Sequence, residues 1–362
     1  MSNDNGKISV KQAMIFIIII FCAPAIRYIP LFTAQQAKQA AWISPLIAII
    51  FEIIYMLIWN KFIKRYASKS YIDIVKDIVG KLIGNIICIM YFLWITFLLS
   101  YNVRMYCERI VATAMPGVSI FIVLGTMLLI VGYIVKNGIV TLAKMAELFF
   151  IALSIIFIVY NVLILPKIEL QNIFPITYKD AFPIFKANFG IIAIFAYNIL
   201  IFIFNDKIDH KGDFKKLSMK TTIILSVISL LVIIIPLSVF GWSILVKMPI
   251  PYINTMTEIS LFDVIERIES GMIMFWIISD FILISTFIYT AIHIIRLSFK
   301  MPNIRSTSII YIIGIFFLSL ILARSTIELS VLSLKILTPL NIIMGYLIPI
   351  LIFIIAKIRK KV

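Results

Sequence analysis

The chain has 362 residues, of which 62% are hydrophobic, and its mean hydropathy is +1.11. That many apolar side chains exceed what a soluble core can bury, so the composition excludes a water-soluble protein and predicts an integral protein with many membrane spans. The formal charge of +16 resides in short loops between apolar stretches, which indicates membrane topology rather than binding to nucleic acid.

Ten apolar segments, each long enough to cross a hydrocarbon core, follow one another along the chain. The polar start MSNDNGK precedes a segment without a small-residue cleavage pattern, so we expect the first span to stay in the mature protein. The segments leave no room for a separate soluble domain, and we expect one membrane domain over residues 1–362. The expected spans cover residues 11–33, 42–60, 83–103, 117–135, 145–165, 187–204, 221–246, 271–295, 307–323 and 336–356.

The first span carries helix-breaking residues at membrane depth. The sequence IFIIIIFCAPAIRYIP places Ala23, Pro24, Ala25, Arg27 and Pro30 where an apolar helix would continue. A proline inside a helix removes a backbone hydrogen bond and clashes with the preceding turn. In a membrane the freed groups are tolerated only against protein or a wet cavity. We therefore expect an interrupted helix that borders a binding site near the bilayer midplane.

Basic residues are unevenly divided between alternate loops. If the N-terminus is inside, 22 of the 33 lysines and arginines fall on the inner side and 10 on the outer side, with Arg104 and Arg109 among the outer ones and Arg27 within a span. Because inner loops carry the excess of positive charge, we expect both termini in the cytoplasm.

Two loops are predicted to carry amphipathic helices. The inner loop 61–82 favours a helix in the interface plane, whose apolar face is formed by Ile72, Val75, Ile78, Val79 and Leu82. The run ISLFDVIERIES at residues 259–270 predicts a short surface helix that covers an outer vestibule. The cysteines have no metal-type or paired spacing and are expected to pack as small hydrophobic residues; they are Cys22, Cys88 and Cys107.

Ten spans divide into five and five, as in transporters built from inverted repeats. We expect repeat one over about residues 11–165 and repeat two over about residues 187–356. The sixth span then corresponds to the first, and it carries Ala196, Tyr197 and Asn198 midway. The predicted fold class is an all-α integral membrane protein with about ten transmembrane helices in a five-plus-five inverted repeat, in which the first and sixth helices are interrupted.

Two charged residues are expected inside spans, where an unpaired charge is costly. Arg27 could grip a substrate carboxylate with its planar guanidinium, or pair with an intramembrane acid such as Asp280, or extend toward the membrane surface. Asp280 could bind a cation or the ammonium group of an amino acid, carry a proton, or pair with Arg27. Glu147 is expected to pair with Lys144 on the same helix.

Aromatic and amide side chains could complete a small-molecule site, which typically has apolar walls and a few polar tips. The candidates are Tyr91 and Trp94 in the third span and Phe195, Tyr197 and Asn198 in the sixth; plain helix packing is the alternative. The sequence shows no nucleophile–base pair, phosphate loop or pair of histidines at a common centre. It therefore does not indicate an enzyme, and we expect no metal or cofactor.

Short motifs follow one order along almost the whole chain. They are ISVKQ at residues 8–12, the break before Pro30, AWIS at 41–44, IVGKLIG at 78–84, VRMYCERI at 103–110, NGIVTLAKMAE at 137–147 and VIERIESGMIMFWI at 264–277. In this order they resemble the endospore germination permeases, the B subunits of nutrient germinant receptors within the amino acid–polyamine–organocation superfamily. The last motif is the most specific, because membrane composition alone rarely produces it.

The resemblance implies that a small nutrient, typically an amino acid, binds between the first, third, sixth and eighth spans, and it adds Leu283 and Phe287 to the candidate site. It also implies two partners, a larger A subunit and a lipoprotein C subunit, and a location in the inner membrane of a bacterial spore. Two departures concern the site. Relatives tend to have Gly-x-Gly where this chain has Ala23–Ala25, and an acidic residue in the sixth span near Asn198.

The leading hypothesis is a nutrient sensor, which shifts its partners because the nutrient binds two conformations with different affinity. The alternative is an ion-coupled amino acid transporter that uses the same pocket, since one fold serves both roles. A third hypothesis, prompted by the substituted positions, is a structural subunit whose pocket no longer binds.

Overall fold

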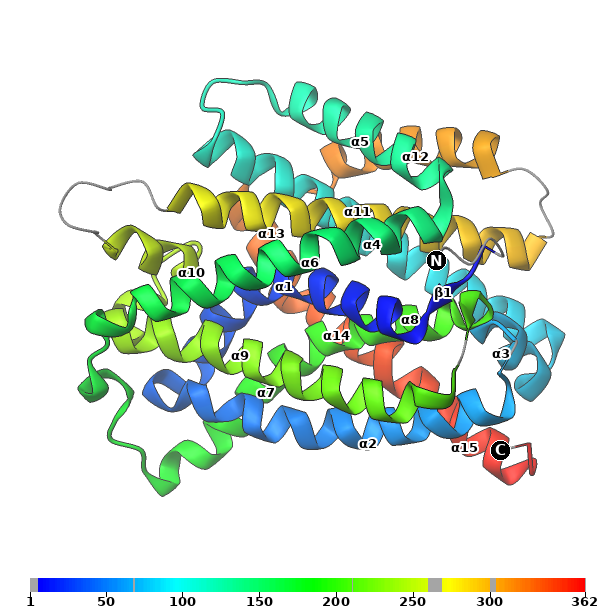
Figure 1. Ribbon diagram of the computed structural model, residues 1–362, viewed down its shortest axis with the longest axis horizontal. Helices are drawn as coiled ribbons and strands as arrows, with labels where there is room; N and C mark the ends of the chain where they lie inside the picture. Colours follow the sequence, from blue (N-terminus) through cyan, green and yellow to red (C-terminus); the bar gives the residue numbers. More distant parts are fainter. Residues whose placement is uncertain (1–5, 68, 210, 260–268, 300–303, 362) are drawn as a thin grey trace.

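The computed structural model describes residues 6–67, 69–209, 211–259, 269–299 and 304–361. These residues form an all-α bundle, and most of its long helices run along one common direction (Figure 1). The longer helices are α1 (Val10–Ala37), α2 (Ser44–Arg65), α4 (Lys81–Thr113), α5 (Ile120–Lys136), α6 (Gly138–Leu163), α7 (Ala181–Phe195), α9 (Phe214–Leu245), α11 (Glu269–Phe299), α12 (Ile304–Ile321) and α15 (Ile348–Ile358). Shorter ones are α3 (Tyr71–Val79), α8 (Ile199–Ile203), α10 (Pro251–Asn254), α13 (Thr326–Leu332) and α14 (Thr338–Ile342).

The helices supply the ten predicted spans in chain order. Seven stretches of the described residues are long and apolar enough to cross a membrane, and the first of them, Val10–Arg65, contains both α1 and α2. Two shorter apolar helices, Ile120–Lys136 and Thr307–Ile321, provide the remaining spans. The chain is therefore a multi-pass membrane protein, as its composition predicts.

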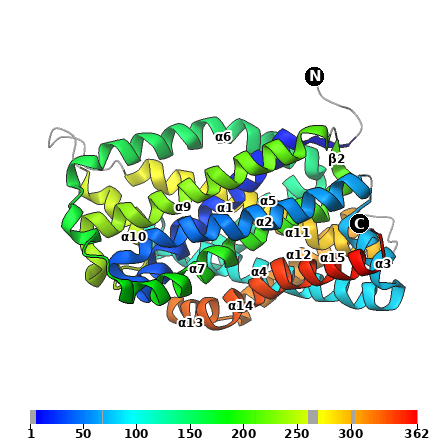
Figure 2. The ribbon, with the colours of Figure 1, turned by 90° about the horizontal axis from the view of Figure 1, so that it is seen from below.

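Helix α1 lies in the middle of the bundle, where it contacts α6, α7, α9 and α11 (Figures 1 and 2). It is continuous from Val10 to Ala37 with Pro24 and Pro30 inside it, so the predicted interruption of the first span is wrong. The prolines remove two backbone donors, but neighbouring helices surround this segment and keep it from lipid. Such surroundings let a transmembrane helix pass through a proline without unwinding.

The sixth span is interrupted where the sequence predicts. Helix α7 ends at Phe195, a 3-10 turn (η5) covers Ala196–Asn198, and α8 continues from Ile199. The tenth span is also irregular, which the sequence did not predict. It contains two π-helical turns, η9 (Ser333–Leu337) and η10 (Ile343–Leu347), a distortion that frequently marks functional sites.

A bend in α9 occurs at Gly241, whose φ of 69° lies in the left-handed region that favours glycine. The buried carbonyl of Ser238 accepts a hydrogen bond of 2.8 Å from Nδ2 of Asn172 and one of 3.1 Å from the backbone of Glu169. The loop before α7 thus supplies hydrogen-bond donors to a backbone carbonyl of α9 next to the bend.

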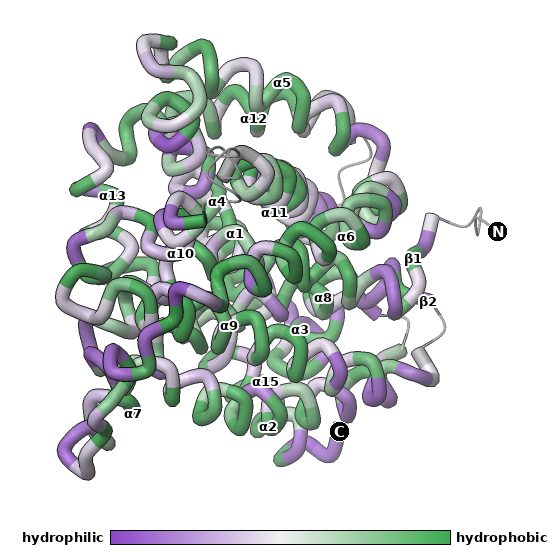
Figure 3. Tube along the Cα trace, turned by 60° about the vertical axis from the view of Figure 1, so that its left-hand side comes forward, coloured by the Kyte–Doolittle hydropathy of each residue, from purple (hydrophilic) through white to green (hydrophobic). Residues whose placement is uncertain are grey.

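The outside of the bundle is apolar, and hydrophilic residues gather in the loops at its ends (Figure 3). Helix α3 forms the predicted amphipathic element, with Ile72, Val75 and Ile78 buried. Leu82 was wrongly assigned to that face, because it belongs to α4 and is 77% exposed. The predicted helix at 259–270 lies largely outside the described residues.

The start of α1 and the end of α15 lie at the same end of the bundle (Figure 2). There the two-residue strands β1 (Ile8–Ser9) and β2 (Ile208–Asp209) pair in parallel. Ser9 also begins α1 with a capping box, in which its side chain accepts from the backbone of Gln12 and the Gln12 side chain accepts from Ser9. The pairing of β1 with β2 connects the start of the first span to the segment after the sixth.

Candidate functional site

Two arginines and one aspartate meet inside the bundle. Nη2 of Arg109 lies 3.3 Å from Oδ2 of Asp280, and Nη1 of Arg27 lies 3.7 Å from Oδ1 of the same carboxylate. Nη2 of Arg27 donates a hydrogen bond of 2.6 Å to Oδ1 of Asn102. The four side chains come from α1, α4 and α11, and all are buried, with Asp280 and Asn102 completely inaccessible.

The position of Arg109 corrects a prediction. The third span is longer than expected, because α4 extends to Thr113, so Arg104 and Arg109 lie within this helix and not in an outer loop. Arg104 pairs with Glu108 one turn away. Arg109 instead points inward, with its guanidinium 4.0 Å from the centre of the Trp276 ring, a favourable cation–π distance.

The charges of this cluster do not balance. Arg27 and Arg109 carry two positive charges against the single carboxylate of Asp280, so these three residues retain one excess positive charge. Nη1 of Arg27 and Oδ1 of Asp280 are both buried and have no hydrogen-bond partner among the described residues. A donor and an acceptor left unmatched in a dry interior are costly, which makes this pair of atoms a candidate contact for a polar ligand.

A small cavity of about 20 Å3 adjoins Arg27. Its volume holds about one water molecule, so any larger ligand requires the surrounding helices to separate. The lining comes from the first, third, sixth and tenth spans and comprises Pro24, Arg27, Tyr28, Tyr101, Ala193, Ile194, Tyr197, Ser333, Leu337, Thr338 and Asn341. The tenth span thus takes the place at this cavity that the family resemblance gave to the eighth.

Some of the predicted site residues gather around this cavity. Pro24, Arg27 and Tyr197 line it. Asp280 does not line it but forms an ion pair with Arg27, which does. Phe287 packs edge-on against Tyr197, with 5.3 Å between the ring centres. These contacts show that Arg27 pairs with Asp280 and does not extend to the membrane surface.

Other predicted residues lie elsewhere. Ala23, Ala25 and Leu283 are completely buried without lining the cavity, and Phe195 packs on Phe21 with 5.2 Å between ring centres. Ala196 lies against Gly345 of the tenth span.

The tenth span also binds the aromatic pair of the third. Trp94 Nε1 donates to Oδ1 of Asn341 at 3.0 Å, and the Tyr91 hydroxyl donates to the carbonyl of Met344 at 2.6 Å. Asn198 faces Glu52 of α2 at 2.6 Å. Tyr91, Trp94 and Asn198 therefore hold helices together and do not line the cavity themselves.

Sequence reasoning missed Arg109, Asn102 and Glu52. Asn102 lies at the end of the third predicted span and Arg109 lies beyond it, and no local signal marks the burial of either side chain. Glu52 is an acidic residue within the second predicted span, and a charge at such a position is a signal for a functional site. Glu147, predicted to pair with Lys144, instead accepts a hydrogen bond of 3.0 Å from Nε2 of Gln12 in α1.

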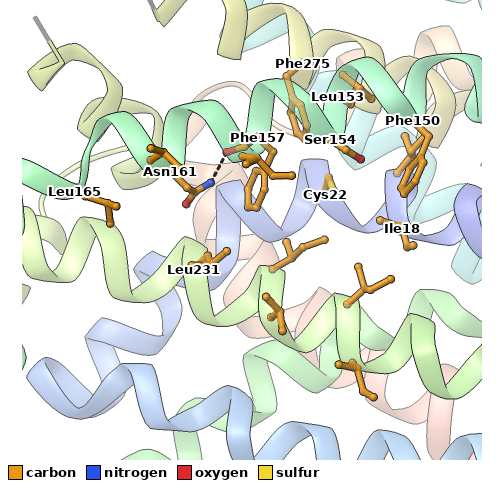
Figure 4. Close-up of a pocket in the computed structure, with 17 residues that line it drawn as sticks. Ile18, Cys22, Phe150, Leu153, Ser154, Phe157, Asn161, Leu165, Leu231 and Phe275 are labelled. Carbon is orange, nitrogen blue, oxygen red and sulfur yellow. Dashed lines mark hydrogen bonds between the residues drawn. The ribbon is translucent and has the colours of Figure 1, made fainter.

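A much larger cavity of about 500 Å3 lies between α1, α6 and α9 (Figure 4). Its walls are almost wholly apolar, with Cys22, Leu153 and Phe157 among them. Several lining side chains face the outside of the bundle, including Ile158, which is 61% exposed. The cavity therefore opens toward lipid and suits an apolar chain better than a polar nutrient.

Two polar side chains, Ser154 and Asn161, interrupt that apolar wall. Asn161 is the more polar of them. Nδ2 of Asn161 donates to the carbonyl of Phe157 at 2.6 Å and to the hydroxyl of Tyr252 at 2.8 Å. Its Oδ1 is buried, has no partner among the residues that the structure describes, and faces the space between α6 and α9 (Figure 4). A single acceptor provides little specificity for a charged ligand.

The fold and the buried site define a class, that of multi-pass helical membrane proteins with an ionic cluster held between distorted spans. The family model described as spore germination protein, the spore permease family, matches residues 7–327. Because this match covers most of the chain, the protein belongs to the spore permease family, as the sequence motifs predict.

Curated relatives agree over similar lengths, and all three named here are from Bacillus subtilis. Spore germination protein KB is 23% identical and is aligned over 99% of this chain and 96% of its own length. Spore germination protein YndE is 26% identical over 80% of each chain. The putative spore germination protein YfkT is 21% identical over 97% of this chain and 96% of its own.

Proposed function

We propose that this protein is the B-type subunit of a spore nutrient germinant receptor, which binds a small germinant, an amino acid, near the bilayer midplane and signals to partner subunits. The observation that carries the proposal is the pair of unmatched buried atoms, Nη1 of Arg27 and Oδ1 of Asp280. The arginine donor suits an α-carboxylate, and the aspartate acceptor suits an α-ammonium group. The excess positive charge of the cluster favours the carboxylate end beside the arginines.

The small size of the cavity supports a sensing role, because a ligand can enter only if the protein changes its conformation. An amino acid is larger than the single water that about 20 Å3 accommodates, so binding must favour a more open arrangement of the lining spans. A ligand can shift a conformational equilibrium only through its different affinity for two states. Separation of the first, sixth and tenth spans would provide the second conformation. A partner subunit in contact with these spans would respond to that conformational change.

The partners and the location belong to the same proposal. Membership of the spore permease family supports an assembly with an A subunit and a lipoprotein C subunit in the inner membrane of the spore. With 22 of 33 basic residues expected on one side, both termini would face the spore core. The bundle surface is apolar enough to contact both lipid and a membrane-embedded partner.

Thermal unfolding of the purified protein with matched small molecules tests the binding step. The probes are L-amino acids, the corresponding amides without a carboxylate, and the corresponding deaminated acids without an ammonium group. We expect one amino acid to raise the melting temperature and its two truncated analogues to have little effect. Arg27→Gln should abolish this shift. Equal stabilisation by the amide and the parent amino acid would contradict the role of Arg27.

A genetic test addresses signalling. Deletion of this protein in a spore former should remove germination in response to one nutrient, and the wild-type chain should restore the response. Arg27→Ala should not restore it. Complementation by Arg27→Ala at wild-type levels would show that the cluster does not take part in the response.

The alternative function, an ion-coupled amino acid transporter, is favoured by one observation. The sixth span lacks an acid near its interruption, but Glu52 of α2 places a carboxylate directly on Asn198. Uptake of radiolabelled amino acids into proteoliposomes that contain only this chain distinguishes the two roles. Accumulation driven by an ion gradient identifies a transporter, whereas binding without accumulation identifies a sensor.

A further inference from the structure

A second buried carboxylate lies apart from the arginine cluster. Glu52 of α2 is completely inaccessible. One of its oxygens, Oε1, accepts a hydrogen bond of 2.6 Å from Nδ2 of Asn198, and the other accepts from the hydroxyl of Tyr346. Both donors are neutral side chains.

Among the described residues, no positively charged side chain pairs with Glu52. The titratable groups that face it are the phenols of Tyr55 on α2 and Tyr346 on the tenth span, with Tyr71 of α3 beyond Tyr55. Helices α7 and α9 also pack on α2, yet the ion pairs of the described residues include none with Glu52. An isolated ionised carboxylate in an apolar interior is so unfavourable that it takes up a proton instead.

Both partners of Glu52 belong to distorted turns. Asn198 ends the 3-10 turn η5 of the sixth span, and Tyr346 lies in the π-helical turn η10 of the tenth. The two turns are in close contact, because a Cβ atom built on Gly345 would lie 2.4 Å from Cβ of Ala196. Tyr55, one turn after Glu52, donates to the carbonyl of Gly345. Helix α2 therefore holds both turns with neighbouring side chains.

We propose that Glu52 is a proton-binding site that controls how tightly α2 holds these two turns. In the neutral form the carboxyl group keeps a hydrogen atom on one oxygen, which can be donated to the Tyr346 oxygen. On release the O–H bond breaks, its electron pair remains on the carboxylate, and the proton passes to water. The anion then accepts from both Asn198 and Tyr346, and such charge-assisted hydrogen bonds are about twice as strong as neutral ones. Deprotonation thus tightens the contact of α2 with the sixth and tenth spans.

Chemical labelling with dicyclohexylcarbodiimide tests the protonation state directly. This apolar reagent adds to a protonated carboxyl group and does not react with a carboxylate. A cavity of about 250 Å3 between α2, α7 and the tenth span is lined by Tyr55 and Tyr346, the two tyrosines beside Glu52, so the reagent can approach within one side chain of the carboxyl group. Asp280 is the comparison residue, since it is equally buried but forms ion pairs with two arginines.

We expect mass spectrometry of the full chain in detergent or liposomes to find the adduct on Glu52 and not on Asp280, and the extent of labelling to fall as pH rises. Infrared spectra should show a protonated carboxyl band that is lost in Glu52→Gln. Tyr346→Phe removes a donor to the anion and should raise the midpoint of the labelling curve by about one pH unit.

The result that overturns the proposal is an unlabelled Glu52 at every pH, together with an infrared spectrum that Glu52→Gln leaves unchanged while the variant remains folded. Protection of Glu52 from the reagent by sodium chloride, at constant ionic strength against choline chloride, would assign the site to a sodium ion instead and also contradict a proton site. Neither readout involves a nutrient, so the outcome is independent of the proposed germinant binding.

Discussion

Nη1 of Arg27 and Oδ1 of Asp280 face each other 3.7 Å apart in the interior of the bundle, and neither atom has a hydrogen-bond partner in the part of the chain that the structure describes. The two residues come from the first and eighth predicted spans, so the helices on which they lie must pack together to create this contact. Arg109 occupies the other oxygen of the same carboxylate at 3.3 Å. The arrangement leaves a donor and an acceptor available to a ligand that carries both charges.

Replacing Asp280 should strongly destabilise the protein. Asp280→Asn leaves the guanidinium groups of Arg27 and Arg109 buried without a counter-charge, and breaking a buried ion pair in this way costs about 3–5 kcal/mol. We expect a clear fall in the melting temperature of the detergent-solubilised protein. Arg109→Gln should cost less, because the remaining arginine and aspartate balance each other. The double variant Asp280→Asn/Arg109→Gln should be more stable than the sum of the two single effects predicts.

The surface pair of Lys361 and Asp77, 3.5 Å apart, provides the comparison. Lys361→Ala should change stability by at most about 1 kcal/mol, because exposed ion pairs contribute little. An Asp280→Asn protein that unfolds at the same temperature as Lys361→Ala would show that the arginine cluster is solvated.

Enlarging Gly345 should disturb the contact between the sixth and tenth spans. A Cβ atom there would lie 2.4 Å from Cβ and 2.8 Å from Cα of Ala196, so Gly345→Ala should destabilise the protein by about 1–3 kcal/mol through overpacking. Ala196→Gly should restore part of the loss. Gly314 in α12 is the matched control, because a Cβ atom added there would meet no atom within 4 Å. Gly314→Ala should therefore be neutral or slightly stabilising, and equal losses at both glycines would refute the packing explanation.

Stability at acid pH should depend on Asp206, which follows the sixth span. Partial burial alone raises the pKa of Asp206, but the hydrogen bond and charge of His293, 3.3 Å away, together with Lys207, outweigh it and lower the pKa. A lowered folded-state pKa gives stability that is present above the unfolded value of about 4 and is lost as pH falls further.

We therefore expect Asp206→Asn to lower the unfolding free energy by about 1 kcal/mol at pH values above about 5, and the two melting curves to converge on acidification. The exposed Glu258→Gln variant should follow the wild type throughout. A difference between wild type and Asp206→Asn that grows toward acid pH would have the opposite sign to this prediction.

Single cysteines should report the orientation of the chain. The three native cysteines are buried, so a membrane-impermeant maleimide should react only with an introduced one. Lys7→Cys and Lys357→Cys, near the two termini, should label only after cells are permeabilised. Lys167→Cys, in an exposed loop on the other side, should label in intact cells. Labelling of Lys7→Cys and Lys357→Cys from opposite sides would require an odd number of spans.

Much of the fold follows from local pattern. Apolar length predicts the spans, and the 3-10 turn at Ala196–Asn198 falls where an interruption is predicted, at a polar residue inside an apolar span. The same reasoning is wrong for α1. Pro24 and Pro30 disfavour a helix locally, but packing against four neighbouring helices compensates for the missing hydrogen bonds.

The site was less predictable than the fold. Arg27 and Asp280 stand out in sequence because a charge inside a span needs a partner. Arg109 was misplaced, because the end of the third span depends on burial of its polar residues against α11, and no local signal reports that burial. The role of Glu52 depends on hydrogen bonds from Asn198 and Tyr346, and only the tertiary structure brings these residues to it.

The sequence by itself determined the class of protein, the spans and the need for buried charges to be compensated, since each depends on transfer of side chains from water to hydrocarbon, a property of residues taken one at a time. The tertiary structure decided which partners they have. Arg27 meets Asp280, and Glu52 meets Asn198, because helices far apart in the chain pack side by side, and the energy of a buried charge depends on the groups within a few ångströms of it.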